Sequence, residues 1–238
     1  MRLAIDTATD IASVALGEGG TLKTVESMRG ARQHAAGLLP MIQRVLADGG
    51  ARLQEVTEIV VGDGPGSFTG LRIGWAAAKG LAHEHDVPLI AIPSLLGAAH
   101  AASSLDKGSG PLAACYDALR GQVFGAVYAI HPDRVETVVA PGLFTLPELA
   151  RLTPVPPTVA VGDGAERYRA EVESWTGKPP VALDTLPGLA RSLLMLAEYD
   201  ETRRPLIDDL MEPVYGRPAE AQVKWESRHG RPLPNPPR

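Results

Sequence analysis

One glycine-rich run, from residue 62 to residue 74, constrains the fold of this chain more than any other feature. It reads Gly-Asp-Gly-Pro-Gly-Ser-Phe-Thr-Gly-Leu-Arg-Ile-Gly, follows an apolar run at 59–61 and precedes small residues at 75–85. This pattern predicts a strand, a tight loop and a helix, because glycine and proline favour turns. Such a loop either directs backbone N–H groups at an anion, usually a phosphate, or is only a tight turn. It has neither the Gly-Lys-Ser/Thr ending of a P-loop nor a clean dinucleotide fingerprint.

Small residues recur in the helix predicted after this loop. Gly70, Gly74 and Ala78 are spaced four apart and therefore share one helix face. Glycine inside a helix costs about 1 kcal/mol relative to alanine, so its repeated use indicates a close approach on that face. The neighbour is either the sheet of the same chain or a helix of another subunit.

Composition favours a globular protein of the cytoplasm. Hydrophobic residues make up 45% of the 238 residues, which is enough for a substantial core. No apolar stretch approaches the ~20 residues of a membrane span, and no signal-peptide pattern follows Met1. The single cysteine, Cys115, lies in an apolar run and is predicted to be a buried thiol rather than a nucleophile. The net charge of −5, with a basic C-terminal segment, leaves the rest of the chain acidic and argues against strong autonomous nucleic-acid binding.

The order of predicted elements is repeated in the two halves of the chain. In the first half we expect strands at 3–7, 12–16 and 21–28, a helix at 35–47, a strand at 59–61, a helix at 69–85, a strand at 89–92 and a helix at 94–103. In the second half we expect strands at 112–116, 122–129 and 135–139, a helix at 146–152, a strand at 158–161 and helices at 165–175 and 189–199. Asp6 and Asp117 end the first strand of each half, and Gly-Asp-Gly follows the fourth strand at 62–64 and 162–164. These matches predict a duplicated βββαβαβα unit.

The predicted domains are an N-terminal lobe at 1–105, a C-terminal lobe at 110–215 and a disordered, basic, proline-rich tail at 216–238. Two such lobes resemble the two-lobed α/β fold of the actin-like ATPase superfamily (ASKHA, RNase H-like), in which a nucleotide lies between the lobes. The resemblance implies a phosphate or nucleotide loop made by Asp6, Thr7, Thr9, Gly64, Gly66 and Ser67. Bulky residues at 118–120 follow Asp117, where a second phosphate loop needs glycines and a hydroxyl.

Several segments together give a more specific resemblance, to the TsaB (YeaZ) family of bacterial partner proteins in threonylcarbamoyladenosine synthesis on transfer RNA. The matching segments are 64–72 (Gly-Pro-Gly-Ser-Phe-Thr-Gly-Leu-Arg), 5–9, 39–42, 117–124, and Pro213-Val214-Tyr215 with Arg217, Glu220 and Ala221. They span about residues 1 to 225, with the proline-rich tail outside the match.

This resemblance implies a non-catalytic scaffold without catalytic residues or a metal site. The catalytic paralogue, TsaD, carries a His-x-x-x-His metal pair roughly where this chain has Ser94 and Ala98. The implied partners are a TsaD-type enzyme, a TsaE-type ATPase and a second copy of the chain when it is alone, with tRNA reached only through the complex. No intrinsic cofactor is expected, and ATP or ADP with Mg²⁺ belongs only to the assembled complex. Alternatives are an actin-fold kinase or phosphotransferase that uses Asp6 and Asp117, and a metal-dependent protease, which the missing histidine pair disfavours.

The partner interface is predicted on the two helices of the first lobe. One presents apolar side chains at helical spacing and the other presents the small face. The predicted interface residues are Leu38, Leu39, Ile42, Leu46, Gly70, Gly74 and Ala78.

Overall fold

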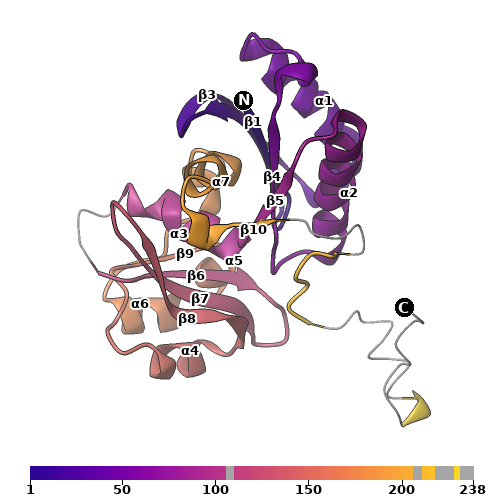
Figure 1. Cartoon of the computed structure of the whole chain (residues 1–238). Helices are drawn as coiled ribbons and strands as arrows, with labels where there is room; N and C mark the ends of the chain where they lie inside the picture. The colour runs from indigo at the N-terminus through magenta and orange to yellow at the C-terminus, as the bar shows by residue number, and fades with distance from the viewer. Residues whose placement is uncertain (106–109, 206–210, 218–227, 231–238) are drawn as a thin grey trace.

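Layers of helices alternate with two β-sheets in this computed structural model (Figure 1). It describes residues 1–105, 110–205, 211–217 and 228–230. The predicted boundary between the lobes, and most of the predicted tail at 216–238, therefore lie outside the described residues.

The first sheet has six strands in the order β10-β5-β4-β1-β2-β3. The strands are β1 (Arg2–Asp6), β2 (Ile11–Glu18), β3 (Thr21–Arg29), β4 (Glu58–Gly62), β5 (Leu89–Ile92) and β10 (Arg204–Pro205). β1 pairs antiparallel with β2 and parallel with β4, with Ile5 opposite Val61. Because β1 and β4 run in the same direction, the loops that follow them meet at one edge of the sheet.

The second sheet repeats this arrangement with four strands in the order β8-β7-β6-β9. They are β6 (Leu112–Asp117), β7 (Val123–Ile130), β8 (Val135–Phe144) and β9 (Val159–Val161). β6 pairs antiparallel with β7 and parallel with β9, as β1 does with β2 and β4. Where a fifth strand would follow, a single parallel bridge joins Val161 to Val181. The predicted two-lobed α/β class is confirmed, with this fifth strand reduced to one bridge.

Helices cover both sheets and fill the space between them. The helices are α1 (His34–Asp48), α2 (Phe68–His85), α3 (Ser94–Ser103), α4 (Leu146–Leu152), α5 (Asp163–Arg167), α6 (Arg169–Thr176) and α7 (Leu189–Leu196), with 3-10 turns at 31–33, 53–55, 183–185 and 200–202. α1 and α2 share a hydrophobic core with one face of the first sheet, and α4, α5 and α6 share one with the outer face of the second. α3 and α7 lie between the sheets in a core that includes residues of both (Figure 1). No helix in the described part of the chain is long and apolar enough to cross a membrane.

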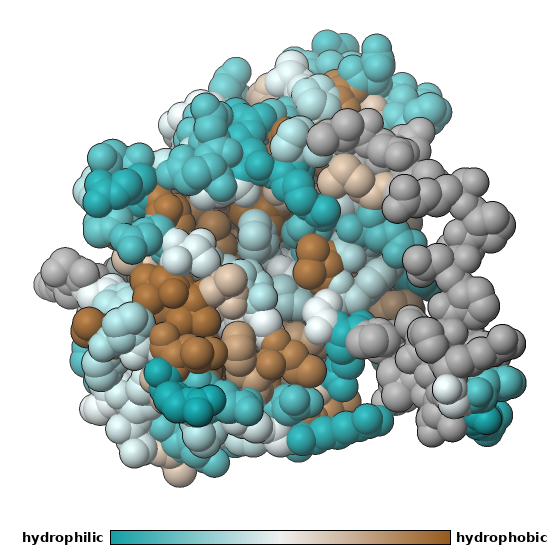
Figure 2. Space-filling model, turned by 60° about the horizontal axis from the view of Figure 1, so that its bottom comes forward, coloured by the Kyte–Doolittle hydropathy of each residue, from teal (hydrophilic) through white to brown (hydrophobic). Residues whose placement is uncertain are grey.

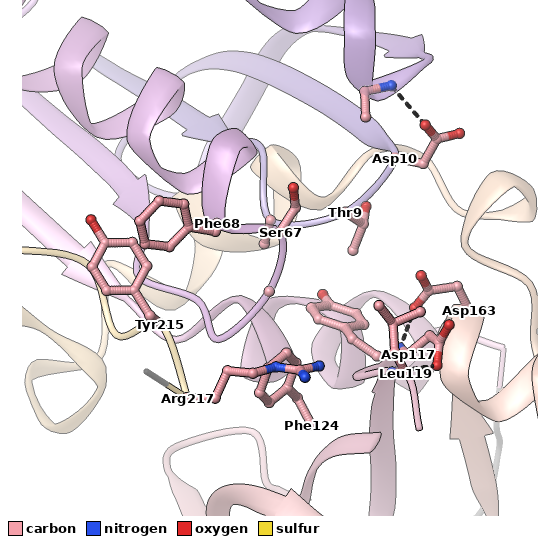
Figure 3. A pocket seen from close by; sticks show the side chains of 14 residues that line it. Thr9, Asp10, Ser67, Phe68, Asp117, Leu119, Phe124, Asp163, Tyr215 and Arg217 are labelled. Atoms are coloured by element: carbon pink, nitrogen blue, oxygen red, sulfur yellow. Dashed lines mark hydrogen bonds between the residues drawn. The ribbon is translucent and has the colours of Figure 1, made fainter. Parts of the chain in front are cut away.

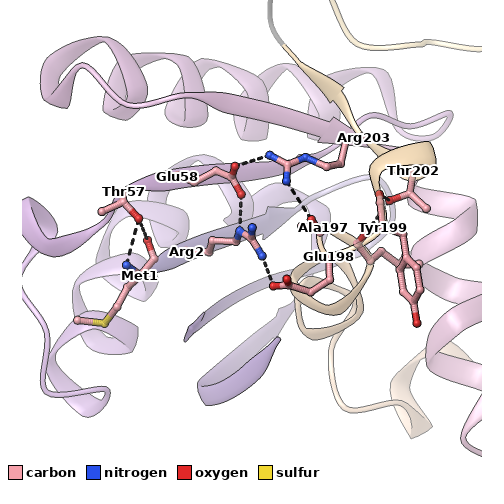
Figure 4. Close-up of polar contacts among 10 residues, drawn as sticks. Met1, Arg2, Thr57, Glu58, Ala197, Glu198, Tyr199, Thr202 and Arg203 are labelled. Atoms are coloured by element: carbon pink, nitrogen blue, oxygen red, sulfur yellow. Dashed lines mark hydrogen bonds and ion pairs between the residues drawn. The ribbon is translucent and has the colours of Figure 1, made fainter. Parts of the chain in front are cut away.

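Two elements late in the chain lie with the first sheet. α7 packs on β1 and β2, and β10 pairs antiparallel with β5. An ionic network fixes this return (Figure 4): Arg2 contacts both Glu58 and Glu198, and Arg203 contacts Glu58 and donates to the Ala197 carbonyl over 3.2 Å. The segment after residue 188 therefore ties the second lobe to the first.

Six of the seven residues of the predicted interface are buried within the chain. Leu38, Ile42 and Leu46 are buried in the core that α1 shares with the first sheet. Gly70, Gly74 and Ala78 are buried on the inner side of α2. The reason is that an apolar helix face packs first on the sheet of its own chain, so these residues offer no surface to a partner. The side chain of Leu39 is 55% exposed, so a contact between Leu39 and a partner stays a prediction.

The small face of α2 is shaped by Thr7, just after β1. A Cβ added to Gly70 would lie 2.1 Å from the Thr7 carbonyl oxygen, and one added to Gly74 would lie 2.2 Å from Thr7 Oγ1. The spacing allowed two neighbours for this face, the sheet of the same chain or a helix of another subunit. The observed neighbour is the first of these, at the loop that follows β1. A larger residue at either position would push α2 away from β1.

Two identical substitutions in α2 should have opposite effects on stability. Gly70→Ala places a methyl group against backbone and should lower the free energy of unfolding by about 1–3 kcal/mol, as overpacking does. The methyl group that Gly80→Ala adds has no atom within 4 Å. This substitution should raise the free energy of unfolding by up to about 1 kcal/mol, because alanine has the higher helix propensity. Urea denaturation of the two variants measures both values. Equal effects at the two positions would contradict this account of the helix face.

Candidate functional site

The loop after β4 packs directly on the loop after β1, which brings the predicted phosphate-loop residues together. Gly66 lies so close to the first loop that an added Cβ would be 2.2 Å from the Ala8 carbonyl oxygen. The Ser67 N–H donates to that oxygen over 2.7 Å, and the Thr7 hydroxyl donates to the Gly70 carbonyl over 2.8 Å. Asp6, Thr7 and Thr9 are thus adjacent to Gly64, Gly66 and Ser67, as predicted for one composite loop.

Backbone N–H groups of this composite loop are largely used within the chain. Those of Asp63 and Gly64 donate to the Ile92 carbonyl and to Ser94 Oγ over 2.7 and 3.2 Å. The Gly70 N–H donates to Ser67 Oγ over 3.2 Å, which caps α2, and the Ser67 N–H is bonded to Ala8. Four donors that a phosphate-binding loop would direct outward therefore hold the loop to its surroundings. Of the two interpretations of the sequence, the geometry favours the tight turn.

Asp6 is enclosed rather than presented to a ligand. Its side chain has no exposed surface, and its Oδ2 accepts the Ser94 hydroxyl over 2.7 Å. Its Oδ1 accepts the Ala8 N–H over 3.2 Å. Desolvation raises the pKa of Asp6 above its usual range, against the lowering effect of these two hydrogen bonds. Asp6 therefore joins the end of β1 to the start of α3.

A cleft of about 470 Å³ lies between the lobes at the ends of β1 and β6 (Figure 3). Thr9, Gly66 and Ser67 of the predicted loop line it, whereas Asp6, Thr7 and Gly64 do not. Aromatic side chains dominate the rest of its wall: Phe68, Tyr116, Phe124 and Tyr215. Figure 2 shows hydrophobic residues gathered in groups bordered by hydrophilic ones on one face of the molecule.

Two carboxylates stand at the second-lobe side of the cleft. Asp163 Oδ1 accepts the N–H groups of Asp117 and Gly164 over 3.1 and 2.9 Å. Arg167 Nη1 lies 3.1 Å from Asp117 Oδ2. Desolvation raises the pKa of Asp163, and the neighbouring charge of Asp117 adds to the increase against the backbone hydrogen bonds. Leu119 and its neighbour Arg120 turn the chain here with φ values of 61° and 53°.

Residues 211–217, which span the predicted end of the C-terminal lobe and the predicted start of the tail, complete the cleft wall; we term this segment the strap. Its Val214 N–H donates to the Asp63 carbonyl over 2.8 Å. The Tyr215 ring lies 4.6 Å from the Phe68 ring, and Arg72 donates to the Tyr215 hydroxyl over 3.2 Å. The Pro-Val-Tyr and Arg217 pattern, noted only as a resemblance, was the one sequence signal that could have found this segment.

The strap passes between the lobes at Gly216. A Cβ added there would lie 2.7 Å from Pro65 Cβ in the first lobe and 2.6 Å from the Phe124 ring in the second. Its φ of +75° also favours glycine. The next residue, Arg217, lies over the Phe124 ring, with the guanidinium 5.5 Å from the ring centre. The strap thus contacts both lobes and fixes the aromatic side of the cleft.

These residues do not fit the nucleotide and Mg²⁺ that the superfamily resemblance implies. The aspartate of the first loop is enclosed and cannot reach the cleft, and four loop N–H groups are already bonded. The second loop presents Leu119 and two carboxylates to the position of a phosphate. A phosphate group there would meet these negative charges rather than the N–H donors of a phosphate-binding loop.

Cys115 has the structural role that the sequence predicted. It is fully buried in β6, and burial raises the pKa of its thiol to about 12. A thiol that stays protonated at neutral pH is a poor nucleophile.

Asp63, which precedes the glycine turn, should make stability depend on pH. It is buried beside Arg204, and desolvation raises its pKa from 3.8 to about 6 against the effect of that arginine. The folded protein then binds more protons than the unfolded chain between these values, so stability falls as pH rises through this window. Relative to Asp63→Asn, wild type should lose up to about 3 kcal/mol between pH ~4 and ~7, at 1.36 kcal/mol per pKa unit.

Urea denaturation of wild type and Asp63→Asn across this pH range measures the difference between their unfolding free energies. The other carboxylates contribute equally to both proteins, so their effect cancels in this difference. Asp133→Asn, at an exposed turn, is the matched control and should follow wild type. A difference between wild type and Asp63→Asn that is flat, or that rises with pH, would contradict the effect of burial.

Comparison with known proteins relates the chain to one family. The family model of tRNA N6-adenosine threonylcarbamoyltransferase (TsaD) matches residues 26–175, well over half of the chain. The tRNA threonylcarbamoyladenosine biosynthesis protein TsaB of Escherichia coli is 38% identical over 145 residues, which cover 58% of this chain and 62% of that protein. TsaB of Haemophilus influenzae is 42% identical over 122 residues, which cover 51% of each. The chain thus spans between half and two thirds of the length of the curated relatives it matches.

Solved structures extend the match over most of the chain. YeaZ from Pseudomonas aeruginosa superimposes with a TM-score of 0.67 at 32% identity, covering 83% of this chain and 91% of that one. A protein described as similar to peptidase YEAZ from the same organism gives a TM-score of 0.72 at 28% identity, covering 91% and 99%. The repeated strand order, the glycine turn packed on the first loop and these matches agree, and the chain belongs to the TsaB (YeaZ) family.

Proposed function

We propose that the chain is a non-catalytic, activating partner of a TsaD-type enzyme that places threonylcarbamoyl on an adenosine of transfer RNA. Its family membership supports this pathway, because curated relatives are named as proteins of threonylcarbamoyladenosine biosynthesis. The acidic body of the chain supports contact with tRNA through the complex rather than alone. The proposal places the protein in the cytoplasm, where transfer RNA is modified.

The observation that carries the non-catalytic role is the environment of Ser94 and Ala98 on α3. The catalytic paralogue is expected to hold its metal with two histidines there. In this chain Ser94 has no exposed surface, donates to Asp6 and accepts the Gly64 N–H. Ala98 is fully buried in the core between the sheets. Both positions serve packing, and a histidine at either would have to displace core atoms.

The proposal assigns no cofactor to the chain itself. The poor fit of the cleft to a nucleotide supports placing ATP or ADP with Mg²⁺ only in the assembled complex, together with a TsaE-type ATPase. The alternative kinase or phosphotransferase would need Asp6 at the phosphates, and its burial disfavours that role. A homodimer in the absence of the enzyme remains part of the proposal.

Reconstitution tests the proposed function. The chain, a TsaD-type enzyme and a TsaE-type ATPase from one source are combined with tRNA and a threonylcarbamoyl donor, and modified adenosine is measured by mass spectrometry. We expect modification only when the chain is present, and negligible ATP turnover by the chain alone. Modification without the chain would contradict the partner role. ATP turnover by the chain alone that Asp6→Asn abolishes would establish the kinase alternative.

The partner surface is proposed on the outer sides of α1 and α2, since their inner sides are buried. Small or apolar residues are exposed there, namely Ala36 and Leu39 on α1 and Ala76 and Gly80 on α2, alongside charged ones such as Arg44 and Arg72. Gly80 has no atom near the position of a Cβ, so the fold itself does not require glycine there. Small residues on an exposed helix side allow a helix of another chain to approach closely.

Ala76→Arg should separate binding from folding. The side chain would enter solvent in the free protein, so the unfolding free energy should change by less than about 0.5 kcal/mol. A bulky charge in a close helix contact should weaken binding of the TsaD-type partner by about tenfold or more, the equivalent of 1.4 kcal/mol. Calorimetry measures the affinity, with Ala170→Arg on exposed α6 as the matched control. Equal affinity of the two variants would move the interface away from α2.

A further inference from the structure

The two ends of the interlobe cleft differ in chemistry (Figure 3). Phe68, Tyr215 and Phe124 line one end, with Arg217 over the Phe124 ring. Asp117 and Asp163 line the other end, beside the 53% exposed side chain of Leu119. The cleft therefore has an apolar, aromatic part next to a negatively charged part. A ligand complementary to both needs an apolar body and a positive charge.

The carboxylate end is held in position by the backbone. The Asp117 and Gly164 N–H groups fix Asp163 Oδ1, and the Leu119 N–H donates to Asp117 Oδ1 over 2.9 Å. Desolvation raises the pKa of the Asp163 carboxyl group, and a cation placed beside it would favour the charged form. Arg167 pairs with Asp117 Oδ2, the oxygen that the Leu119 N–H does not use, and Asp163 has no ion pair among the described residues.

The aromatic end is held by the strap. Gly216 fills the space between Pro65 and Phe124, and Tyr215 is fixed by Phe68 and by the hydrogen bond from Arg72. Side chains that are already ordered lose little conformational entropy when a ligand binds. The aromatic surfaces are thus prepared to contact apolar groups.

We propose that this cleft binds a lysine or arginine side chain carried by an apolar peptide segment of a partner protein. The charged group lies between Asp117 and Asp163, and the neighbouring apolar residues pack on Phe68, Tyr215 and Leu119. This goes beyond the proposed function and does not depend on the identity of the modifying enzyme.

The negative charges of Asp117 and Asp163 disfavour a phosphate-bearing ligand in the same cleft. A phosphate at the second loop would face two carboxylates, and four N–H groups of the first loop are bonded within the chain. Arg217 is the cation in the described cleft wall, and it lies at the aromatic end over Phe124. A basic peptide meets attraction at the carboxylates and apolar contact elsewhere.

Blocked tripeptides of matched size test the proposal on the full chain. The probes are acetyl-Phe-Lys-Leu-amide, its neutral norleucine analogue and acetyl-Phe-Glu-Leu-amide, with affinities measured by NMR titration. We expect the lysine peptide to bind about tenfold or more tightly than the glutamate peptide, a difference of about 1.4 kcal/mol. Its binding should shift amide resonances of the cleft residues, and Mg²⁺-ATP should not displace it.

Asp163→Asn removes the charge and keeps the side-chain oxygen that accepts the two backbone N–H groups. It should lower the affinity of the lysine peptide to about that of the norleucine peptide, whereas the matched control Asp133→Asn should leave it unchanged. Phe68→Ala, at a partly exposed position, should weaken all three peptides. No measurable binding of the lysine peptide, equal affinities for lysine and glutamate, equal effects of the two asparagine variants, or displacement by Mg²⁺-ATP would overturn the proposal. Reconstituted tRNA modification is measured separately, so either proposal can fail without the other.

Discussion

The contact between the glycine turn and the loop after β1 determines most of what this structure can do. It places Gly66 against the Ala8 carbonyl and the inner side of α2 against Thr7, distances that exclude any side chain at Gly66, Gly70 or Gly74. Because β1 and β4 are parallel neighbours, closing their two loops on each other also sets the angle at which α2 leaves the sheet. The position of α2 in turn determines which of its sides is left for a partner.

The same contact uses N–H groups that a phosphate-binding loop would direct at its ligand. In a nucleotide-binding fold the N–H groups of such a turn point at the ligand, whereas here they bond to Ile92, Ser94 and Ala8. Ser94 completes the change, since one hydroxyl satisfies both the Asp6 carboxylate and the Gly64 N–H. Ser94 therefore stabilises the glycine turn and the buried Asp6 carboxylate at the same time.

Local patterns predicted the elements well, and non-local contacts set the limits of that prediction. Strands and helices with clear periodicity lie close to their predicted ranges, although the helix predicted at 165–175 is divided at Tyr168 into α5 and α6. β10 has two residues and depends on an arginine network that joins distant segments, so no local pattern could reveal it.

The candidate site was predicted in part for the same reason. Spacing identified the small face of α2, but spacing does not say which neighbour requires it, and the observed neighbour is Thr7. Apolar periodicity likewise marked Leu38 and Ile42 as one face without telling a core from an interface. The cleft wall depends on the strap, which reaches Phe68 and Phe124 from the far end of the chain. Only a folded chain brings those rings together.

The two lobes repeat one pattern and differ in the surroundings of the aspartate in the Gly-Asp-Gly turn. Asp63 and Asp163 occupy equivalent places in Gly-Asp-Gly turns, and desolvation raises the pKa of both. In the first lobe Arg204 supplies a cation from the same chain, and the strap covers the position through Val214. In the second lobe the equivalent carboxylate opens into the cleft beside Asp117. If both turns need a positive charge, the first is satisfied internally and the second by another molecule. This asymmetry leaves Asp117 and Asp163 of the second lobe lining the cleft, whereas Asp63 of the first lobe is paired with Arg204 of the same chain.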